Sequence, residues 1–295
     1  MLCQFTFRNY RSYRDETELS MQATSMREFE RSLIECPDGQ NFLPVAAVYG
    51  PNAGGKSNLL EALDYIRSAV ARPIRLLSAS TDVPEGNRSS IPRCSAFEVD
   101  DVSAAKPTKV ERYYRAGEHE YRYALSVHAD EIVSEGLWRR KLGASRTAML
   151  FEREGTGVEL GPTLRKLVTA ARFNPSLPYL SFLCINFDAP VVKEAASWFL
   201  DGVFLNYNSS YLEQMLEQLL DEDDSPEVTR FLCAVDVRID GFRVERAPEW
   251  RGQRVFVRHE VGDKAYELRL SEESAGTQKL MGLAAYLMTA LERGG

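Results

Sequence analysis

Several features that would place a protein in a special class are scarce in this 295-residue sequence. The five cysteines are scattered, with no CxxC pair and an odd total, which suggests neither a disulfide framework nor a zinc site. No run of about 18 or more apolar residues occurs, and arginines stand where a signal peptide would have its apolar region. We therefore expect a cytoplasmic protein without a membrane segment.

An excess of positive charge is also absent. The chain has 36 Lys and Arg against 43 Asp and Glu, a formal net charge of -7, which argues against a protein that coats nucleic acid non-specifically. A local basic patch could still bind phosphates, so DNA stays open as a partner. The densest basic cluster, residues 138–141, could contact a DNA backbone or could protect a solvated strand edge.

What is present is a globular composition, 44% hydrophobic and 27% charged, enough for one large or two modest domains. The most informative pattern is GxxxxGK[ST]. It is formed here by Gly50, Pro51, Asn52, Ala53, Gly54, Gly55, Lys56 and Ser57. A chance match in a chain of this length is expected roughly 0.01 times. The alternative is a glycine-rich turn with a surface lysine.

The chemistry of this pattern is phosphate binding. Glycines let backbone N–H groups turn inward around phosphates, and the following helix directs its positive N terminus at them. Lys56 is expected to reach the β and γ phosphates, and the Ser57 hydroxyl is expected to ligate Mg²⁺. The sequence around the loop fits, because residues 43–49 form an apolar run typical of a buried strand and apolar residues from Leu59 to Val70 recur at helical spacing. We predict an ATP site with magnesium.

The rest of the chain alternates between strand and helix patterns. Residues 3–19 predict two short strands, residues 71–92 an exposed loop, and residues 163–234 helices, among them 211–219. A further helix is predicted near 228–235. Strands of an antiparallel meander are predicted at 95–99, 110–116, 120–127, 131–140 and 148–153, and further strands at 241–246, 253–259 and 264–270. A final helix is predicted from about Ser274.

The string YGPNAGGKSNLLEAL resembles the nucleotide-binding loop of RecF-like, SMC-like and OLD-like ATPases in the ABC superfamily, including prokaryotic "AAA family ATPase" proteins. The N-terminal FRNYRSYRD, residues 7–15, looks like the opening strands of those ATPases. The resemblance implies that Arg11 and Ser12 lie near the base and ribose. The alternative is that Tyr10 and Tyr13 belong to a plain sheet core and that the arginines are solvated.

Near the other end, LSEESAGTQKL at 270–280 is similar to the ABC signature motif. The resemblance implies that Ser274 and Gly276 bind the γ phosphate held by a partner subunit, at a helix N terminus suited to anions. Ala275 and Thr277 depart from the usual LSGGQ. The alternative is an ordinary serine-capped helix start.

In the family, an acidic strand that holds magnesium and activates water follows the signature helix. The sequence given reaches Gly295 about where that strand, the Walker B strand, is expected. We therefore expect a portion of a longer ATPase that binds ATP and hydrolyses it slowly. Asp236 and Asp240 are not expected to be catalytic, since these acids alternate with apolar residues. The three histidines are expected to be structural or solvated. The sequence does not place a Q-loop.

The predicted fold is a mixed α/β P-loop NTPase head of ABC/SMC-like type, with an antiparallel β subdomain and a helical insertion. Four segments are expected: 1–70 with the P-loop, 71–160 with the β subdomain, 161–240 as the insertion, and 241–295 with the signature helix. The resemblance implies an ATPase head that forms a homodimer through sandwiched ATP, in DNA repair or phage defence, beside a nuclease or another effector. The alternative is a non-catalytic nucleotide-binding regulatory subunit of such an effector.

Overall fold

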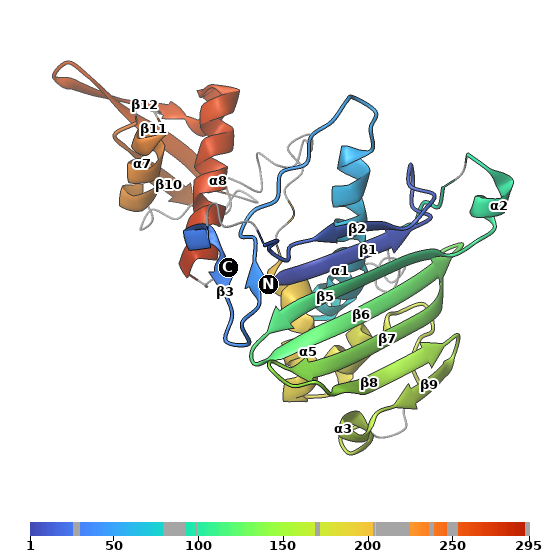
Figure 1. The fold of residues 1–295 in the computed structure, drawn as a ribbon. Coiled ribbons are helices and arrows are strands. Elements are labelled where there is room, and N and C mark those ends of the chain that lie inside the picture. Colours follow the sequence, from blue (N-terminus) through green and yellow to red (C-terminus); the bar gives the residue numbers. More distant parts are fainter. Residues whose placement is uncertain are drawn as a thin grey trace. The chain divides into compact units, whose positions relative to one another are not determined.

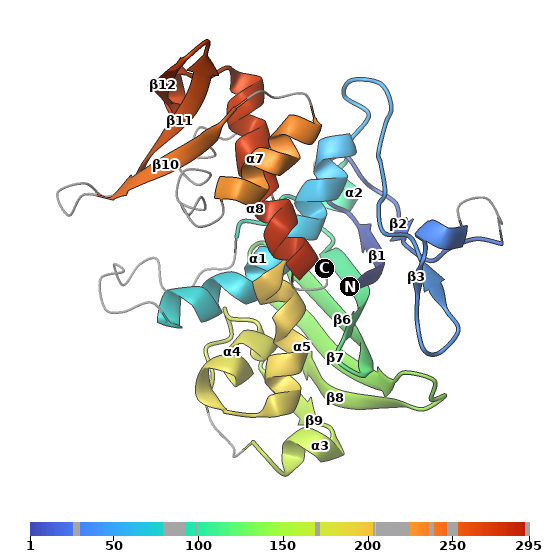
Figure 2. The ribbon, with the colours of Figure 1, turned by 90° about the vertical axis from the view of Figure 1, so that its left-hand side faces the viewer.

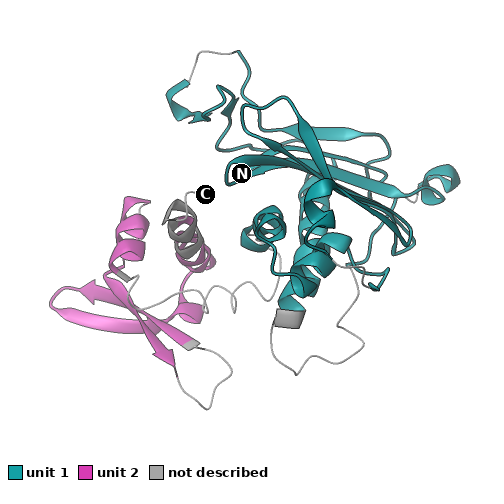
Figure 3. Ribbon diagram, turned by 90° about the horizontal axis from the view of Figure 1, so that it is seen from below, with its two compact units in different colours: residues 1–202 teal, residues 203–295 magenta. Residues whose placement is uncertain are grey.

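A computed structural model describes residues 1–25, 30–78, 92–97, 99–168, 172–202, 204, 225–235, 239–246 and 253–292. The chain forms two compact units, residues 1–202 and 203–295 (Figure 3). Within the described ranges, no helix has the length and apolarity needed to cross a membrane. The boundary between the units falls inside the predicted 161–240 segment; the four-segment division stays a prediction.

The first unit is built on an antiparallel sheet of seven strands in the order β2-β1-β5-β6-β7-β8-β9 (Figure 1). Its strands are β1 (Leu2–Arg8), β2 (Thr17–Ser20), β5 (Thr108–Ala116), β6 (His119–His128), β7 (Glu131–Lys141), β8 (Thr147–Glu154) and β9 (Gly157–Leu160). Alternate residues are buried along β1, as Cys3, Phe5 and Phe7 are. Since successive side chains point to opposite faces of a strand, one face of the sheet forms the core.

Helices cover that apolar face. The three long ones are α1 (Lys56–Ser78), α4 (Tyr179–Asn186) and α5 (Pro190–Asp201), which lie together on one side of β6, β7 and β8 (Figure 2). Short helices α2 (Asp101–Ala104), α3 (Pro162–Arg165) and η1 (Glu30–Ser32) connect other parts of the unit. The core between sheet and helices is rich in aromatic side chains, with Tyr114, Tyr121 and Phe199 almost fully buried.

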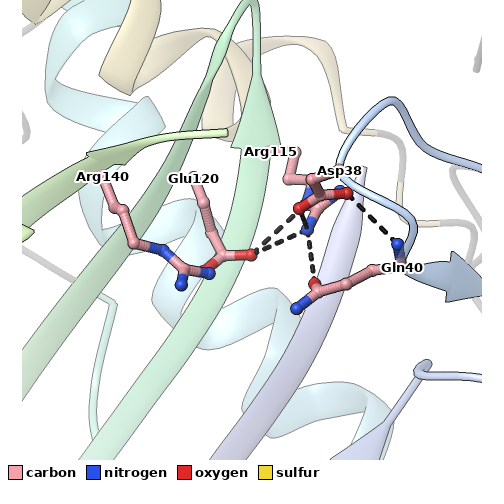
Figure 4. A network of polar contacts seen from close by, with 5 residues as sticks. All are labelled: Asp38, Gln40, Arg115, Glu120 and Arg140. Atoms are coloured by element: carbon pink, nitrogen blue, oxygen red, sulfur yellow. Dashed lines mark hydrogen bonds and ion pairs between the residues drawn. The ribbon is translucent and has the colours of Figure 1, made fainter. Parts of the chain in front are cut away.

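A small hairpin, β3 (Ile34–Glu35) and β4 (Asn41–Phe42), lies directly before residues 43–49, which lead into the Gly50–Ser57 loop. Arg115 of β5 anchors it through hydrogen bonds to both carboxylate oxygens of Asp38, at 3.0 and 2.7 Å, and to Gln40 (Figure 4). Glu120 joins the network through Arg115 at 3.2 Å and Arg140 at 2.6 Å. Because Arg115 and Asp38 are almost completely buried, the hairpin is fixed to the sheet just before residue 43.

The second unit packs two helices against a three-stranded antiparallel sheet of order β10-β11-β12. Its elements are α7 (Ser225–Ala234), β10 (Gly241–Arg246), β11 (Gln253–Val261), β12 (Lys264–Arg269), η4 (Leu270–Glu272) and α8 (Ala275–Glu292). A separate core forms around Val255 and Val257 of β11, with Met281 of α8 and Leu232 of α7.

Much of the predicted layout is confirmed. The chain is mixed α/β, as expected of a P-loop head. The meander forms with β5 to β8 close to the predicted ranges, and the strands at 241–270 and both flanking helices are present. The two opening strands pair antiparallel, with Phe5 opposite Leu19.

The predicted buried strand at 43–49 is wrong. This segment is neither strand nor helix, and Val45 and Tyr49 are 74% and 87% exposed. Its apolar pattern is real, but a strand needs a neighbour to take its backbone hydrogen bonds. Among the described residues, the backbone hydrogen bond of this segment is the one that the N–H of Leu43, its first residue, donates to the Met21 carbonyl.

Two further expectations are corrected. Residues 95–97 form no strand, although Arg11 N–H donates to the carbonyl of Ser95. Helix α1 continues through residue 78 with Pro73 inside it, so the predicted loop at 71–92 does not begin at 71. The remainder of that loop up to 91, and the helical spacing at 211–219, lie outside the described residues.

Candidate nucleotide-binding site

The Gly50–Ser57 loop joins an extended segment to the first turn of α1. Gly55 has φ +85°, a conformation that strains other residues, and Ala53 also has a positive φ of 62°. The Gly54 N–H donates to the Pro51 carbonyl at 3.1 Å, which closes a turn inside the loop. The loop thus curls into the N terminus of α1, where N–H groups without intrahelical partners favour an anion.

The ammonium of Lys56 lies against the loop itself. Its Nζ donates to the carbonyls of Gly50 at 2.9 Å and Pro51 at 2.7 Å. Both contacts are solvent-exposed, so phosphate oxygens can replace these carbonyls without breaking a buried interaction. Ser57 is exposed on the first turn of the helix. Its hydroxyl suits Mg²⁺, which usually keeps several waters and takes its other ligands from phosphates.

The predicted N-terminal site residues lie at the tip of a tight turn. Tyr10 and Tyr13 exchange backbone hydrogen bonds of 2.8 and 2.9 Å, and Arg11 between them adopts a left-handed φ of 48°. Both tyrosine rings pack edge-on against Phe7. Burial of the rings therefore fixes the turn and directs Arg11 and Ser12 away from the sheet core. Burial also raises the pKa of Tyr10 to about 12, so its hydroxyl stays neutral.

This turn contacts the phosphate loop and α1. Ser12 Oγ accepts a hydrogen bond from Asn58 at 2.8 Å, and Arg11 forms an ion pair with Glu61. A Cβ on Gly55 would lie only 2.9 Å from Ser12 Oγ. The structure therefore brings Arg11 and Ser12 beside the loop. Their place near the base and ribose stays a prediction.

Three contacting residues were missed by the sequence analysis: Asn58, Glu61 and Tyr13, whose hydroxyl donates to the Gly55 carbonyl at 3.3 Å. Asn58 and Glu61 follow Lys56 at two and five positions, which places them on the first turns of α1. The resemblance implied that the 9–14 turn lies near the nucleotide. No local pattern indicated its contacts with Asn58 and Glu61, because these contacts join residues more than 40 positions apart.

The N-terminal turn also lines a cavity of about 610 Å³. Its charged lining residues are Arg8, Arg14, Lys106, Asp15, Glu16 and Asp100. Equal numbers of basic and acidic groups give this cavity no net preference for an anion.

The signature-like segment lies in the second unit, at the start of α8. The Thr277 N–H donates to Ser274 Oγ at 3.1 Å, so the serine caps the helix. The Glu273 carboxylate contacts His259 Nε2 at 2.6 Å, and the Glu273 carbonyl accepts a hydrogen bond from the Gln278 side chain. The serine-capped helix start is therefore present as local structure. Gly276 is exposed. Apart from its chain neighbours and the backbone of its own helix, Ser274 Oγ is the atom that lies within 4 Å of a Cβ placed on it among the described residues.

The remaining polar candidates have local roles. Within the described ranges, no group of three or more His, Cys, Asp or Glu could hold a metal ion. Asp240 accepts a hydrogen bond from the Glu260 N–H, and His119 contacts Glu194 at 2.8 Å. Asp236 lies outside the described residues.

The basic cluster at 138–141 belongs to β7, an internal strand. Its suggested role in protecting a strand edge is therefore wrong. Arg140 pairs with Glu120 and Lys141 with Glu118. Contact of this cluster with DNA stays a prediction.

Comparison with known protein families identifies one whose model matches this chain. No curated protein matches the chain. A family model described as "AAA domain, putative AbiEii toxin, Type IV TA system" matches residues 45–294. The match spans most of the sequence and includes both the Lys56 loop and the Ser274 segment. The chain therefore belongs to this family of AAA domains, which are P-loop proteins of ATPase type.

Proposed function

We propose that this chain binds ATP with Mg²⁺ in the Gly50–Ser57 loop and that bound ATP switches the association of two such chains. The observation that carries the first part is the position of Lys56. Its ammonium donates to two loop carbonyls at the start of a 23-residue helix. A cation and a helix N terminus that meet at one exposed point favour a polyphosphate.

In this proposal each residue has a role fixed by its chemistry. Backbone N–H groups of the loop hold the β phosphate, Lys56 reaches the β and γ phosphates, and Ser57 ligates Mg²⁺. Arg11 and Ser12, which contact the first turns of α1, are placed beside the base and ribose. The contacts of Ser12 with Asn58 and of Arg11 with Glu61 support this assignment, because they hold both side chains next to the loop.

The second part of the proposal is an ATP sandwich. The Lys56 loop of one chain would hold ATP, and Ser274, Gly276 and the first N–H groups of α8 in a partner chain would contact its γ phosphate. The exposed start of α8 supports this role. A nuclease or another effector is the further partner we propose, and ATP-dependent association would control it. The slow hydrolysis expected from the sequence stays a prediction, and so does the non-catalytic regulatory alternative.

The test of ATP binding is Lys56→Ala, measured by isothermal titration calorimetry with ATP and Mg²⁺. We expect about 100-fold weaker binding, since the substitution removes charge-assisted hydrogen bonds worth about 3 kcal/mol. Lys166→Ala removes an equal charge from an exposed site at the end of α3 and serves as the control.

Both variants should unfold at the wild-type temperature, because Lys56 makes only exposed contacts. Equal ATP affinity in wild type and Lys56→Ala would show that the loop is not the nucleotide site.

A further inference from the structure

The face of the large sheet opposite the helices carries a trough. Figure 1 shows this face of β5 to β8, and no described helix crosses it. The strand register places side chains in two rows across the four strands. The first row is Glu111, Ala124, Gly136 and Glu152, and the second is Lys109, Ser126, Ser134 and Glu154. Small residues on the two central strands thus form a floor between charged walls.

We call this feature the β6–β7 trough. It has a volume of about 320 Å³ and is lined by all eight residues of the two rows, together with Trp138. Adjacent strands lie about 4.8 Å apart, so the walls on β5 and β8 are separated by about three such spacings. That width admits an extended peptide with its side chains.

The β8 wall is negatively charged. Glu152 and Glu154 belong to it, and Glu159 of β9 stands directly opposite Glu152. Like charges placed opposite each other in a sheet repel. Among the residues that the structure describes, no Lys, Arg or His forms an ion pair with these three carboxylates. On the other wall, Glu111 is already paired with Arg122 at 2.8 Å.

The floor contains a polar group without a partner. Ser126 is 4% exposed, and its Oγ makes no hydrogen bond within the described part of the chain. A buried hydroxyl that lacks a partner costs free energy. The second row places it between Lys109 and Ser134, in the floor of the trough.

The protein itself shows which group suits this surface. At the end of the trough, Arg122 lies 4.6 Å from the centroid of the Trp138 ring while it pairs with Glu111. The indole lies across Gly136, where a Cβ would be 2.1 Å from the ring, and its Nε1 donates to Glu152. A cation between an aromatic ring and a glutamate is thus already part of this face, while the β8 wall has the glutamates without the cation.

We propose that the β6–β7 trough is a docking site for a basic segment of a partner protein. An arginine or lysine side chain would lie over the small floor residues and pair with Glu152 and Glu154. Charge complementarity selects this occupant, because Glu152, Glu154 and Glu159 have no cationic partner among the described residues and outnumber Lys109 of the opposite wall, so they repel the phosphates of DNA or RNA. This proposal is independent of nucleotide binding at Lys56.

The probe for this proposal is a labelled tetra-arginine peptide, titrated into the full chain at low ionic strength and followed by fluorescence anisotropy. We expect binding that weakens as salt is added. The double variant Glu152→Gln/Glu154→Gln should bind the peptide about five-fold more weakly or worse. Glu18→Gln/Glu227→Gln has the same change in net charge at exposed positions that do not line the trough and should bind like wild type.

A second variant, Ser134→Arg, places a guanidinium inside the trough. We expect it to fold, because Ser134 is only partly buried, and to lose peptide binding because the site is already filled. Equal affinity of wild type, the Glu152/Glu154 variant and Ser134→Arg would overturn the proposal. So would a wild-type chain that does not bind tetra-arginine, or a loss of affinity in the Glu18/Glu227 control as large as in the trough variant.

Discussion

At the scale of single residues, two buried arginines differ in how their charge is accommodated: one guanidinium is hydrogen-bonded and the other is packed against aromatic rings. Arg153 donates to Glu135 at 3.5 Å and to the carbonyls of Leu177 and Pro175. Arg112 is just as buried, but its guanidinium nitrogens have no hydrogen-bond partner among the described residues. Its Cζ atom lies instead over the rings of Trp198 and Phe199, 3.4 and 3.6 Å from the ring centroids. Burial lowers the pKa of Arg112 to about 9.

This difference gives opposite expectations for stability. Arg112→Met should raise the free energy of unfolding at pH 7 by about 1 to 2 kcal/mol, because a buried charge without a partner costs more than its ring contacts return. Arg153→Met should lower it by about 3 to 5 kcal/mol, since the substitution leaves the Glu135 carboxylate buried without its cation. Only neutral donors, Tyr123 and the Tyr179 and Leu180 N–H groups, are then hydrogen-bonded to it among the described residues. Urea unfolding of both variants checks the pair. A destabilised Arg112→Met chain would show that the aromatic contacts outweigh desolvation.

The pH dependence of this effect has a defined sign. The folded-state pKa of Arg112 is lowered, so above about pH 9 the unfolded chain binds more protons than the folded chain. Stability of the wild type should therefore rise with pH in this range relative to Arg112→Met. The advantage of the methionine variant should be complete at pH 7 and smaller at pH 10.

At the scale of elements, what could be predicted depends on where the stabilising partner lies. Helix α1 and strands β5 to β8 follow from periodicity, because each buries one stripe or face. Strands β5 to β8 are also each paired with the next strand along the chain. The GxxxxGK[ST] pattern likewise placed Lys56 and Ser57 correctly on the first turn of a helix.

The failures have a shared cause. The 43–49 segment has the composition of a strand, yet its backbone has no neighbouring strand among the described residues. The contact of Ser12 with Asn58 and the bond of Arg115 to Asp38 join residues 46 and 77 positions apart. Such contacts are set by tertiary packing, which local patterns do not encode.

The β3–β4 hairpin depends on one such contact. Asp38→Asn should lower the free energy of unfolding by about 1 to 3 kcal/mol at pH 7, because Arg115 loses a buried, charged partner. Asp188→Asn is the matched control: Asp188 also pairs with a cation, Lys193, but both side chains are exposed, so no measurable change is expected. Chemical denaturation measures both. Equal effects of the two substitutions would contradict the importance of burial here.

The same pair predicts an acid dependence. Hydrogen bonds from Arg115 hold the pKa of Asp38 below its usual value. A carboxyl group with a lowered pKa contributes stability that is complete above its unfolded pKa, about 3.8, and is lost as pH falls through the folded value. The difference between wild type and Asp38→Asn should therefore be constant from pH 5 to 7 and shrink below pH 4.

At the scale of the whole molecule, the two candidate phosphate-binding segments belong to different compact units. The Lys56 loop lies in residues 1–202 and the Ser274 helix in residues 203–295. In the proposed dimer, each chain contributes one segment to each ATP. ATP would then be part of the interface, and its loss would release the partner chain.

The test is Ser274→Arg, measured by light scattering with ATP and Mg²⁺. The larger side chain should block the approach of the partner's nucleotide to α8, so the variant should remain monomeric while its ATP affinity by calorimetry is that of wild type. Ser271→Arg carries the same change three residues earlier at an exposed position of η4 and should associate normally. If Ser274→Arg associates with ATP as wild type does, α8 does not contribute to the interface. If wild-type chains bind ATP but stay monomeric, the sandwich is rejected and nucleotide binding at Lys56 stands alone.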